Sequence, residues 1–326
     1  MRWGGIFLTA EDRLKLGVIG GLAIIDAGWL SAAGYKFDVA SLSSRVLLVG
    51  ALLFVAEIYR RADRNPHFAT ITRETAWLIA FSLAAGLLSN LAITANLPLV
   101  DNQLAAFDHA LGFHWRWWYE FISSDKPVGT LLSAAYVAAL PEIVIVMVAL
   151  AALNRADRVS EMVLATMIGA LIAIAISTLI PAAGPLPYFH PDEATLAVPP
   201  VVDLDYKSTF FALRLGMVHA FSVDDLKGLI AFPSYHATLA VLLVLATRGI
   251  PRLFWPAAVI NAVVLASAPV DGGHHLADVV GGMAVAVVSL AIAHALRGWV
   301  MTPHRIVLAD AAATATPGRM VAPEKS

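Results

Sequence analysis

Long apolar runs alternate with short polar connections along most of the sequence. Eight of these runs approach the roughly 20 apolar residues that a helix needs to cross a bilayer core. A helix also satisfies its own backbone hydrogen bonds, as lipid requires. The pattern therefore predicts eight transmembrane helices, over residues 15–34, 44–60, 75–97, 128–151, 159–181, 229–248, 253–270 and 274–297.

Two connections are much longer than the rest. Residues 98–127 include the aromatic cluster 115–119, which is typical of a helix lying at a membrane interface. Residues 182–228 are rich in proline and acidic side chains and begin with Gly-Pro-Leu-Pro at 184–187, which predicts a loop. The segment 299–326 is rich in alanine, threonine and proline, and we expect it to be a disordered tail.

Composition agrees with a membrane protein. Hydrophobic residues make up 59% of the chain, charged residues only 14%, and the mean hydropathy is +0.74. Soluble domains are about a quarter charged. The net charge of -2 predicts no nucleic-acid partner, and the lack of cysteine excludes disulfides, thiolate metal sites and a cysteine nucleophile. These values predict an all-α, polytopic integral membrane protein in contact with a lipid bilayer.

The distribution of basic residues predicts how the chain is oriented. Most of its 22 lysines and arginines fall on the side of the two termini. The positive-inside rule then places both termini in the cytoplasm and the connections 98–127 and 182–228 outside. We expect the inner membrane of a bacterium, with any site built from these connections on its periplasmic face.

Two short polar segments open predicted helices at this outer end. The first is Phe-Pro-Ser-Tyr-His at 232–236, and the second is Asp-Gly-Gly-His-His-Leu-Ala-Asp at 271–278. One apolar run, leading inward and back, separates them, so the topology brings them to the same end of the bundle. Titratable residues at membrane depth are costly and usually functional. The pattern therefore predicts a site here.

His274 and Asp278 are spaced for mutual contact. Residues four apart lie on one face of a helix, one turn from each other. Asp278 can then accept a hydrogen bond from one ring nitrogen of His274 and leave the other nitrogen as a nucleophile. His275 points about 100° away on the helix and is expected to support the site, as is Asp271, whose simpler interpretation is a turn residue.

The first segment supplies candidates for binding phosphate. Backbone N–H groups and the positive dipole end at a helix N-terminus form an anion site. Ser234 would contact the phosphate there, and a protonated His236 could protonate a leaving alkoxide. The glycine pair 272–273 would let the backbone approach the phosphate closely. The simpler alternatives remain open: Ser234 as a helix N-cap and His236 as an interface histidine.

Together, the two segments resemble motifs of the type 2 phosphatidic acid phosphatase superfamily. Pro-Ser-Tyr-His at 233–236 matches its second motif, P-S-x-H. Ser267, His274 and Asp278 match the spacing of its third motif, S-R-x5-H-x3-D. The resemblance covers roughly residues 75–297. It is closest to the branch that contains inositol phosphorylceramide synthases, which residues 97–101 and 111–115 also resemble.

The resemblance implies an enzyme, either a phosphoric ester hydrolase or a phosphotransferase. His274 would form a phosphohistidine, Asp278 would orient it, and His236 would protonate the leaving group. The implied organisation is two added helices and a cytoplasmic loop over 1–74, then a six-helix core over 75–298.

Two departures from the family pattern concern cations. The first motif, K-x6-R-P, is absent, and Ala268 replaces the arginine of the third motif. Phosphoryl transfer depends largely on charge stabilisation. The outer connection offers Lys207, Arg214 and Lys227 as replacements. Arg214 is the first choice because a guanidinium binds phosphate with two hydrogen bonds; a contact with lipid headgroups is the alternative.

The sequence thus predicts an outward-facing enzyme for a phosphorylated lipid, with no cofactor and no metal. Water or a polyol would accept the phosphoryl group, and 182–228 would cover the site. The predicted phosphate contacts are Ser234, Tyr235, Arg214, Gly273 and Lys227. One alternative is a metal-dependent hydrolase, since histidines and a carboxylate suit zinc; its ligands would be His236, His274, His275 and Asp278. Another alternative is a catalytically inactive relative that binds lipid.

Overall fold

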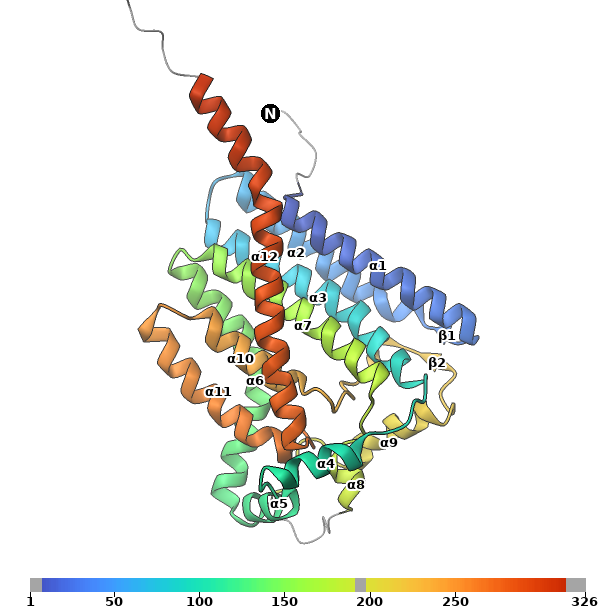
Figure 1. Cartoon of the computed structure of the whole chain (residues 1–326). Coiled ribbons are helices and arrows are strands. Elements are labelled where there is room, and N and C mark those ends of the chain that lie inside the picture. The colour runs from blue at the N-terminus through green and yellow to red at the C-terminus, as the bar shows by residue number, and fades with distance from the viewer. Residues whose placement is uncertain (1–7, 191–197, 315–326) are drawn as a thin grey trace, which may run out of the picture.

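Eight apolar helices run back and forth between the two ends of the protein (Figure 1). The computed structural model describes residues 8–190 and 198–314, with side-chain environments through residue 299. In those ranges the eight helices are α1 (Ala10–Ala33), α2 (Ser43–Arg61), α3 (Pro66–Ile93), α6 (Lys126–Ala152), α7 (Ala156–Leu179), α10 (Tyr235–Ala246), α11 (Pro251–Asp271) and α12 (Leu276–Thr314). Each corresponds to one predicted span.

Local signals set where several of these helices begin. Thr9 and Asp12 form a capping box at the start of α1. Asn65 caps α3 and Asp125 caps α6, each followed by a proline in the first turn, where a missing N–H is harmless. At the other end of α1, Gly34 adopts the left-handed conformation that commonly ends a helix.

Within the described ranges, seven of these eight helices are long and apolar enough to cross a membrane, and only α10 is too short. At about 1.5 Å per residue, its 12 residues span about 18 Å, well short of a bilayer core of about 30 Å. The predicted span 229–248 therefore begins as non-helical chain, because Pro233 and the N-cap Ser234 start the helix late. Leu229 and Ala231 in that chain are buried. Burial within protein makes irregular backbone tolerable at membrane depth.

The short helix is enclosed by the others. It packs against α6, α7, α11 and α12. Close packing against α12 depends on the pair Gly281-Gly282. A Cβ added at Gly282 would lie 2.2 Å from the backbone oxygen of Ser234. The start of α10 is therefore held inside the bundle.

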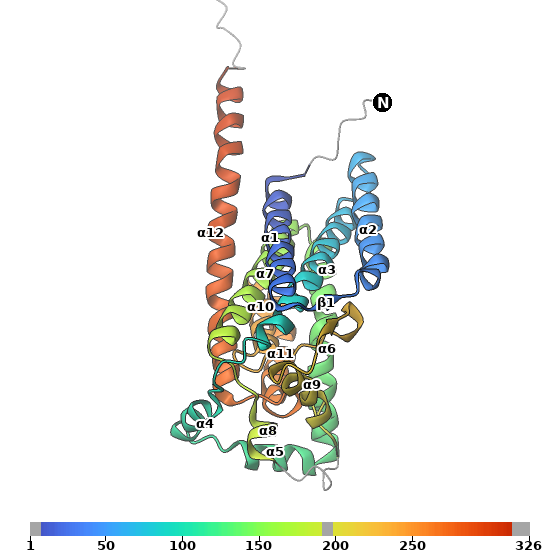
Figure 2. The ribbon, with the colours of Figure 1, turned by 90° about the vertical axis from the view of Figure 1, so that its right-hand side faces the viewer.

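Shorter helices gather at the end opposite the N-terminus (Figures 1 and 2). The predicted interfacial segment 98–127 is helical: it contains α4 (Asp101–Ala110) and α5 (Trp115–Ser124). In α5 the two faces differ, since Trp115 and Tyr119 are buried whereas Trp117 and Phe121 are exposed. One face of α5 thus packs on the bundle and the other is free to meet the interface.

The connection 182–228, predicted as a loop, is more ordered than expected. It contains α8 (Pro185–Phe189), α9 (Leu204–Arg214), a 3-10 turn (Val223–Asp225) and strand β2 (Ala220–Phe221). Strand β2 pairs in parallel with β1 (Lys36–Phe37), which follows α1 and precedes the 3-10 turn Val39–Leu42. Asp203 caps α9, and Phe210 and Leu213 bury its apolar face. This burial accounts for a helix in a segment rich in turn residues.

Ion pairs join the helices at the end that carries the N-terminus. Lys15 on α1 is fully buried and lies 2.5 Å from Glu74 on α3. Arg297 on α12 reaches Glu11 on α1, with 2.8 Å between Nε and Oε1. The final helix continues to Thr314, into the segment predicted as a disordered tail; residues 315–326 lie outside the described ranges.

Candidate active site

The turn between α11 and α12 places the predicted histidine and acid in contact. His274 Nδ1 lies 3.3 Å from Asp278 Oδ2, and the same oxygen accepts a hydrogen bond of 2.8 Å from the backbone N–H of His275. Both side chains are buried. A proton on Nδ1 directed at the carboxylate leaves the Nε2 lone pair of His274 free. The imidazole of His274 is thus held in one orientation by Asp278.

His236 reaches the same cavity from the first turn of α10. A cavity of about 230 Å³ is lined by both His236 and His274. His236 also contacts α6, because its Nδ1 lies 3.0 Å from the hydroxyl of Tyr136. Two histidines that are 38 positions apart in the sequence therefore border one space large enough for a phosphate group.

The cavity has a polar end and an apolar wall. The titratable side chains that line it are His236, His274, Lys207, Tyr136 and Tyr235. Much of the rest of the lining is apolar or small and comes from α3, α7 and the chain before α10: Phe81, Ser82, Ala85, Gly86, Ser89, Ala170, Ala173, Ile174, Val202, Gly228, Ile230 and Gly272. Such a space suits a ligand with a charged head and an apolar neighbouring part.

Glycine is required in the turn that carries His274. A Cβ added at Gly272 would lie 2.5 Å from Cδ2 of His274 and 2.8 Å from the Tyr136 hydroxyl. Gly273 has φ +58, a conformation that favours glycine. Gly272 lines the cavity, whereas Gly273, the predicted phosphate contact, lies against Leu186 and the Lys207 side chain. The pair therefore makes room for the ring and for the lysine.

Lys207 on α9 is the cation that borders the cavity. Its side chain is buried, and it passes the backbone of two glycines: a Cβ added at Gly184 would lie 3.6 Å from Nζ, and one at Gly273 would lie 3.9 Å from Cε. Burial lowers the pKa of Lys207 to about 8, although nearby Asp278 and Asp101 favour its charged form. Among the described residues, its ammonium has no hydrogen-bond partner, so it is available to a ligand.

The other two predicted cations lie elsewhere. The guanidinium of Arg214 donates a 2.7 Å hydrogen bond to the carbonyl of Leu97 and stacks over Phe210. Lys227 Nζ donates to the Thr209 hydroxyl at 3.0 Å. Neither side chain lines the cavity. Of the three predicted cations, the structure therefore places Lys207 at the cavity, because residues on one helix face different neighbours once α9 packs.

The predicted phosphate contacts Ser234 and Tyr235 have other partners. Ser234 is fully buried, and its hydroxyl accepts a hydrogen bond from the backbone of Ala237, so it acts as the N-cap of α10. Its own N–H donates to the carbonyl of Asp278 at 2.9 Å, which ties α10 to α12. Tyr235 lines the cavity, but its hydroxyl donates to the carbonyl of Thr166. Ser234 therefore takes the simpler of its two interpretations.

His275 turns away from the cavity and lies between two acids on α4. Its ring nitrogens are 3.5 Å from Asp101 and 3.4 Å from Asp108. Burial opposes its protonation, but the two carboxylates prevail and raise the pKa of His275 to about 9. Asp101 also accepts from the backbone of residues 183 and 184, and Asp108 from that of 276 and 277.

This arrangement fastens α4 to the turn that carries His274. Motif spacing could not reveal it, since Asp101 and Asp108 were visible only as acids in a connection. Asp271, predicted as supporting, accepts a 2.6 Å hydrogen bond from Ser133 on α6. Within the described ranges, no group of three or more histidine or acidic side chains is arranged to hold a metal ion.

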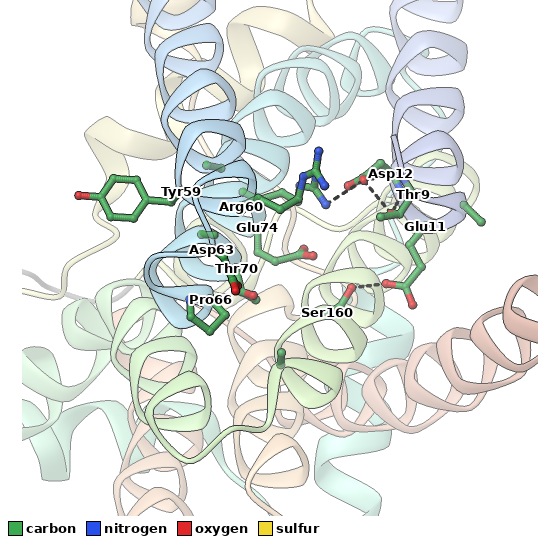
Figure 3. A pocket seen from close by; sticks show the side chains of 15 residues that line it. Thr9, Glu11, Asp12, Tyr59, Arg60, Asp63, Pro66, Thr70, Glu74 and Ser160 are labelled. Carbon is green, nitrogen blue, oxygen red and sulfur yellow. Dashed lines mark hydrogen bonds and ion pairs between the residues drawn. The ribbon is translucent and has the colours of Figure 1, made fainter. Parts of the chain in front are cut away.

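A larger cavity, of about 540 Å³, lies at the end with the N-terminus between α1, α2, α3 and α7 (Figure 3). Most of its charged side chains have protein partners. Asp12 pairs with Arg73 at 3.2 Å, Glu11 accepts from Ser160, and Glu74 pairs with Lys15. With these charges satisfied by protein, this cavity lacks the free cation and imidazoles found at the other end.

Comparisons with known proteins bear on the family of the chain. A search of curated proteins found no match. A search of solved structures found no match either. A family model of the PAP2 superfamily matches residues 102–292, which is more than half of the chain and includes His236, His274 and Asp278. The chain therefore belongs to the PAP2 superfamily.

Proposed function

We propose that the protein removes or transfers the phosphoryl group of a phosphorylated lipid through a phosphohistidine on His274. Membership in the PAP2 superfamily supports a phosphatase-type function in general. The observation that carries the finer proposal is a single cavity that joins His274, oriented by Asp278, with His236 and Lys207. These are a nucleophile, a proton carrier and a cation, the three parts that phosphoryl transfer needs.

In the first step, the Nε2 lone pair of His274 attacks phosphorus and the phosphorus–oxygen bond to the alcohol breaks. His236 gives a proton to the departing oxygen, and Asp278 stabilises the positive charge on the His274 ring. In the second step, water attacks the phosphohistidine, His236 takes its proton, and the phosphorus–nitrogen bond breaks. Phosphate leaves and His274 is regenerated. An alcohol in place of the water would make the same cycle a transfer reaction.

Lys207 takes the place of the cations missing from the first and third family motifs. Its side chain is buried and borders the cavity, and its ammonium has no hydrogen-bond partner among the described residues. A buried cation interacts more strongly with a phosphate than an exposed one, because little water screens it. The substitution of Ala268 for the third-motif arginine is therefore compensated from α9.

The proposed substrate is a lipid phosphate. Apolar side chains of α3 and α7 border the cavity, and both helices are long and apolar enough to cross a membrane. The excess of lysine and arginine on the side of the termini supports a cavity that opens to the periplasm. The resemblance to the inositol phosphorylceramide synthase branch supports a polyol as an acceptor, alongside water.

The test is phosphate release by the detergent-purified protein from a panel of lipid phosphates and diphosphates. We expect activity that EDTA spares, vanadate inhibits and His274→Ala abolishes. His294→Ala is the matched control, because His294 lies on the same helix and is paired with Glu161 far from the cavity. Release that survives His274→Ala would contradict the histidine mechanism. Loss with EDTA alone would favour the metal-dependent alternative, and turnover only with an added polyol would identify a transferase.

A further inference from the structure

Tyr136 is a residue of the site that no family motif contains. It lies on α6, 100 positions before His236 in the chain, and it is buried. Its hydroxyl lies 3.0 Å from His236 Nδ1, and the two rings stack with centroids 4.2 Å apart and planes 25° apart. The tyrosine thus contacts the imidazole both by its face and by its polar tip.

This double contact leaves His236 little freedom. Tyr136 packs in a cluster with Ala237, Ala268 and Val279, so the ring that supports the imidazole is itself held by α10, α11 and α12. Stacking fixes the plane of the imidazole, and the hydrogen bond to Nδ1 fixes the orientation of the ring within that plane. With Nδ1 engaged by Tyr136, Nε2 is the nitrogen left for the cavity that His236 lines.

A hydroxyl is suited to this position because its oxygen can accept a hydrogen bond from an imidazole N–H. When His236 is protonated, both ring nitrogens carry a proton, and Nδ1–H donates to the phenolic oxygen. After Nε2 gives its proton to the leaving oxygen, Nδ1 keeps its proton and the same hydrogen bond. Nε2 is then the unprotonated nitrogen that takes a proton from water in the second step.

We propose that Tyr136 is a positioning residue for proton transfer by His236, which keeps Nε2 directed into the cavity in both protonation states. The inference rests on the proposed function, in which His236 protonates the leaving alcohol. It adds a specific dependence: Tyr136 matters only where the leaving group needs a proton. A tyrosine that served only to pack the bundle would matter equally for every substrate.

Esters with different leaving groups make the test. An alkyl phosphate such as phosphatidic acid in detergent micelles needs a proton on its leaving oxygen, whereas p-nitrophenyl phosphate releases a stable phenolate. The kcat/KM value covers only the steps through departure of that group. For Tyr136→Phe, which keeps the stacked ring, we expect kcat/KM to fall about tenfold with phosphatidic acid. With p-nitrophenyl phosphate it should change less than about twofold.

A double substitution gives an independent readout with phosphatidic acid alone. His236→Ala should lower kcat/KM by about 10²-fold or more. Adding Tyr136→Phe to that variant should cause no further loss, because residues that act through one group are not additive. Tyr59→Phe, which removes a hydroxyl from α2 near the other end, is the control and should match the wild-type enzyme.

The outcomes separate the two proposals. Equal losses with both esters, additive losses in the double variant, or no loss with Tyr136→Phe would overturn the role of Tyr136. In each of those cases His274→Ala would still abolish turnover. Full activity of His274→Ala, or no turnover of either ester by the wild-type protein, would instead contradict the proposed function and the role of Tyr136 with it.

Discussion

Replacing Lys207 by methionine tests whether one buried lysine supplies the charge of the site. Methionine keeps an unbranched apolar chain of similar length, so the packing beside Gly184 and Gly273 is preserved while the ammonium is lost. Among the described residues, the ammonium has no hydrogen-bond partner, and it borders the cavity that His236 and His274 line. We expect a loss of catalysis without a loss of folding.

The magnitude follows from what a phosphate would gain from Lys207. A hydrogen bond to a charged group contributes about 1.5–3 kcal/mol. Since about 1.4 kcal/mol changes a rate tenfold, Lys207→Met should lower kcat/KM about 10- to 150-fold. An ion buried without a bonded partner is costly, and Asp278 and Asp101 offset only part of that cost. The unfolding temperature should therefore stay the same or rise.

The assay is phosphate release from a lipid phosphate in micelles, followed beside thermal unfolding in the same detergent. Arg214→Met is the matched control, because it removes a cation from the same helix whose guanidinium binds the Leu97 carbonyl outside the cavity. Its kcat/KM should stay within about twofold of wild type. The reasoning would be refuted by a Lys207→Met enzyme with wild-type kcat/KM, or by a larger loss in the Arg214 variant.

Three further predictions concern pH and packing. Because the pKa of Lys207 is about 8, the kcat/KM ratio of Lys207→Arg to wild type should rise as pH increases through 8; a flat ratio would contradict the assignment. The pKa of His275, raised from 6.5 to about 9, corresponds to about 3 kcal/mol of stability, complete below pH 6.5 and lost as pH rises through 9. Thermal unfolding should show this loss, and His275→Gln should abolish the dependence. Gly282→Ala should destabilise the protein by about 1–3 kcal/mol, because its Cβ would meet the Ser234 carbonyl, whereas Gly28→Ala, with open space around it, should not.

Features that depend on neighbours in sequence were readable from the chain itself. The eight apolar runs correspond to the eight helices, since hydropathy and backbone hydrogen bonding in lipid are local properties. The contact between His274 and Asp278 follows from their spacing of four, because helix geometry alone brings such residues together. A helix in the connection 98–127 was likewise indicated by its aromatic composition.

Other features depended on packing between distant segments. An apolar run cannot distinguish a full span from a short helix preceded by buried irregular chain, so the true start of α10 at Tyr235 was missed. Turn-rich composition hid α9, whose formation depends on burying Phe210 and Leu213 against other elements. The role of Ser234 as a cap became clear only from its partners.

The sequence by itself determined the membrane class, the order of the helices and the pairing of His274 with Asp278, because each arises from interactions within one element or one turn. Only the tertiary structure decided which cation lies beside that pair and which side chain holds His236 in place. Lys207 is 67 positions from His274, and Tyr136 is 100 positions from His236. Over such separations, charge type and composition say what a residue can do. The packing of α6 against α10, and of α9 against the α11–α12 turn, decides which site each residue joins.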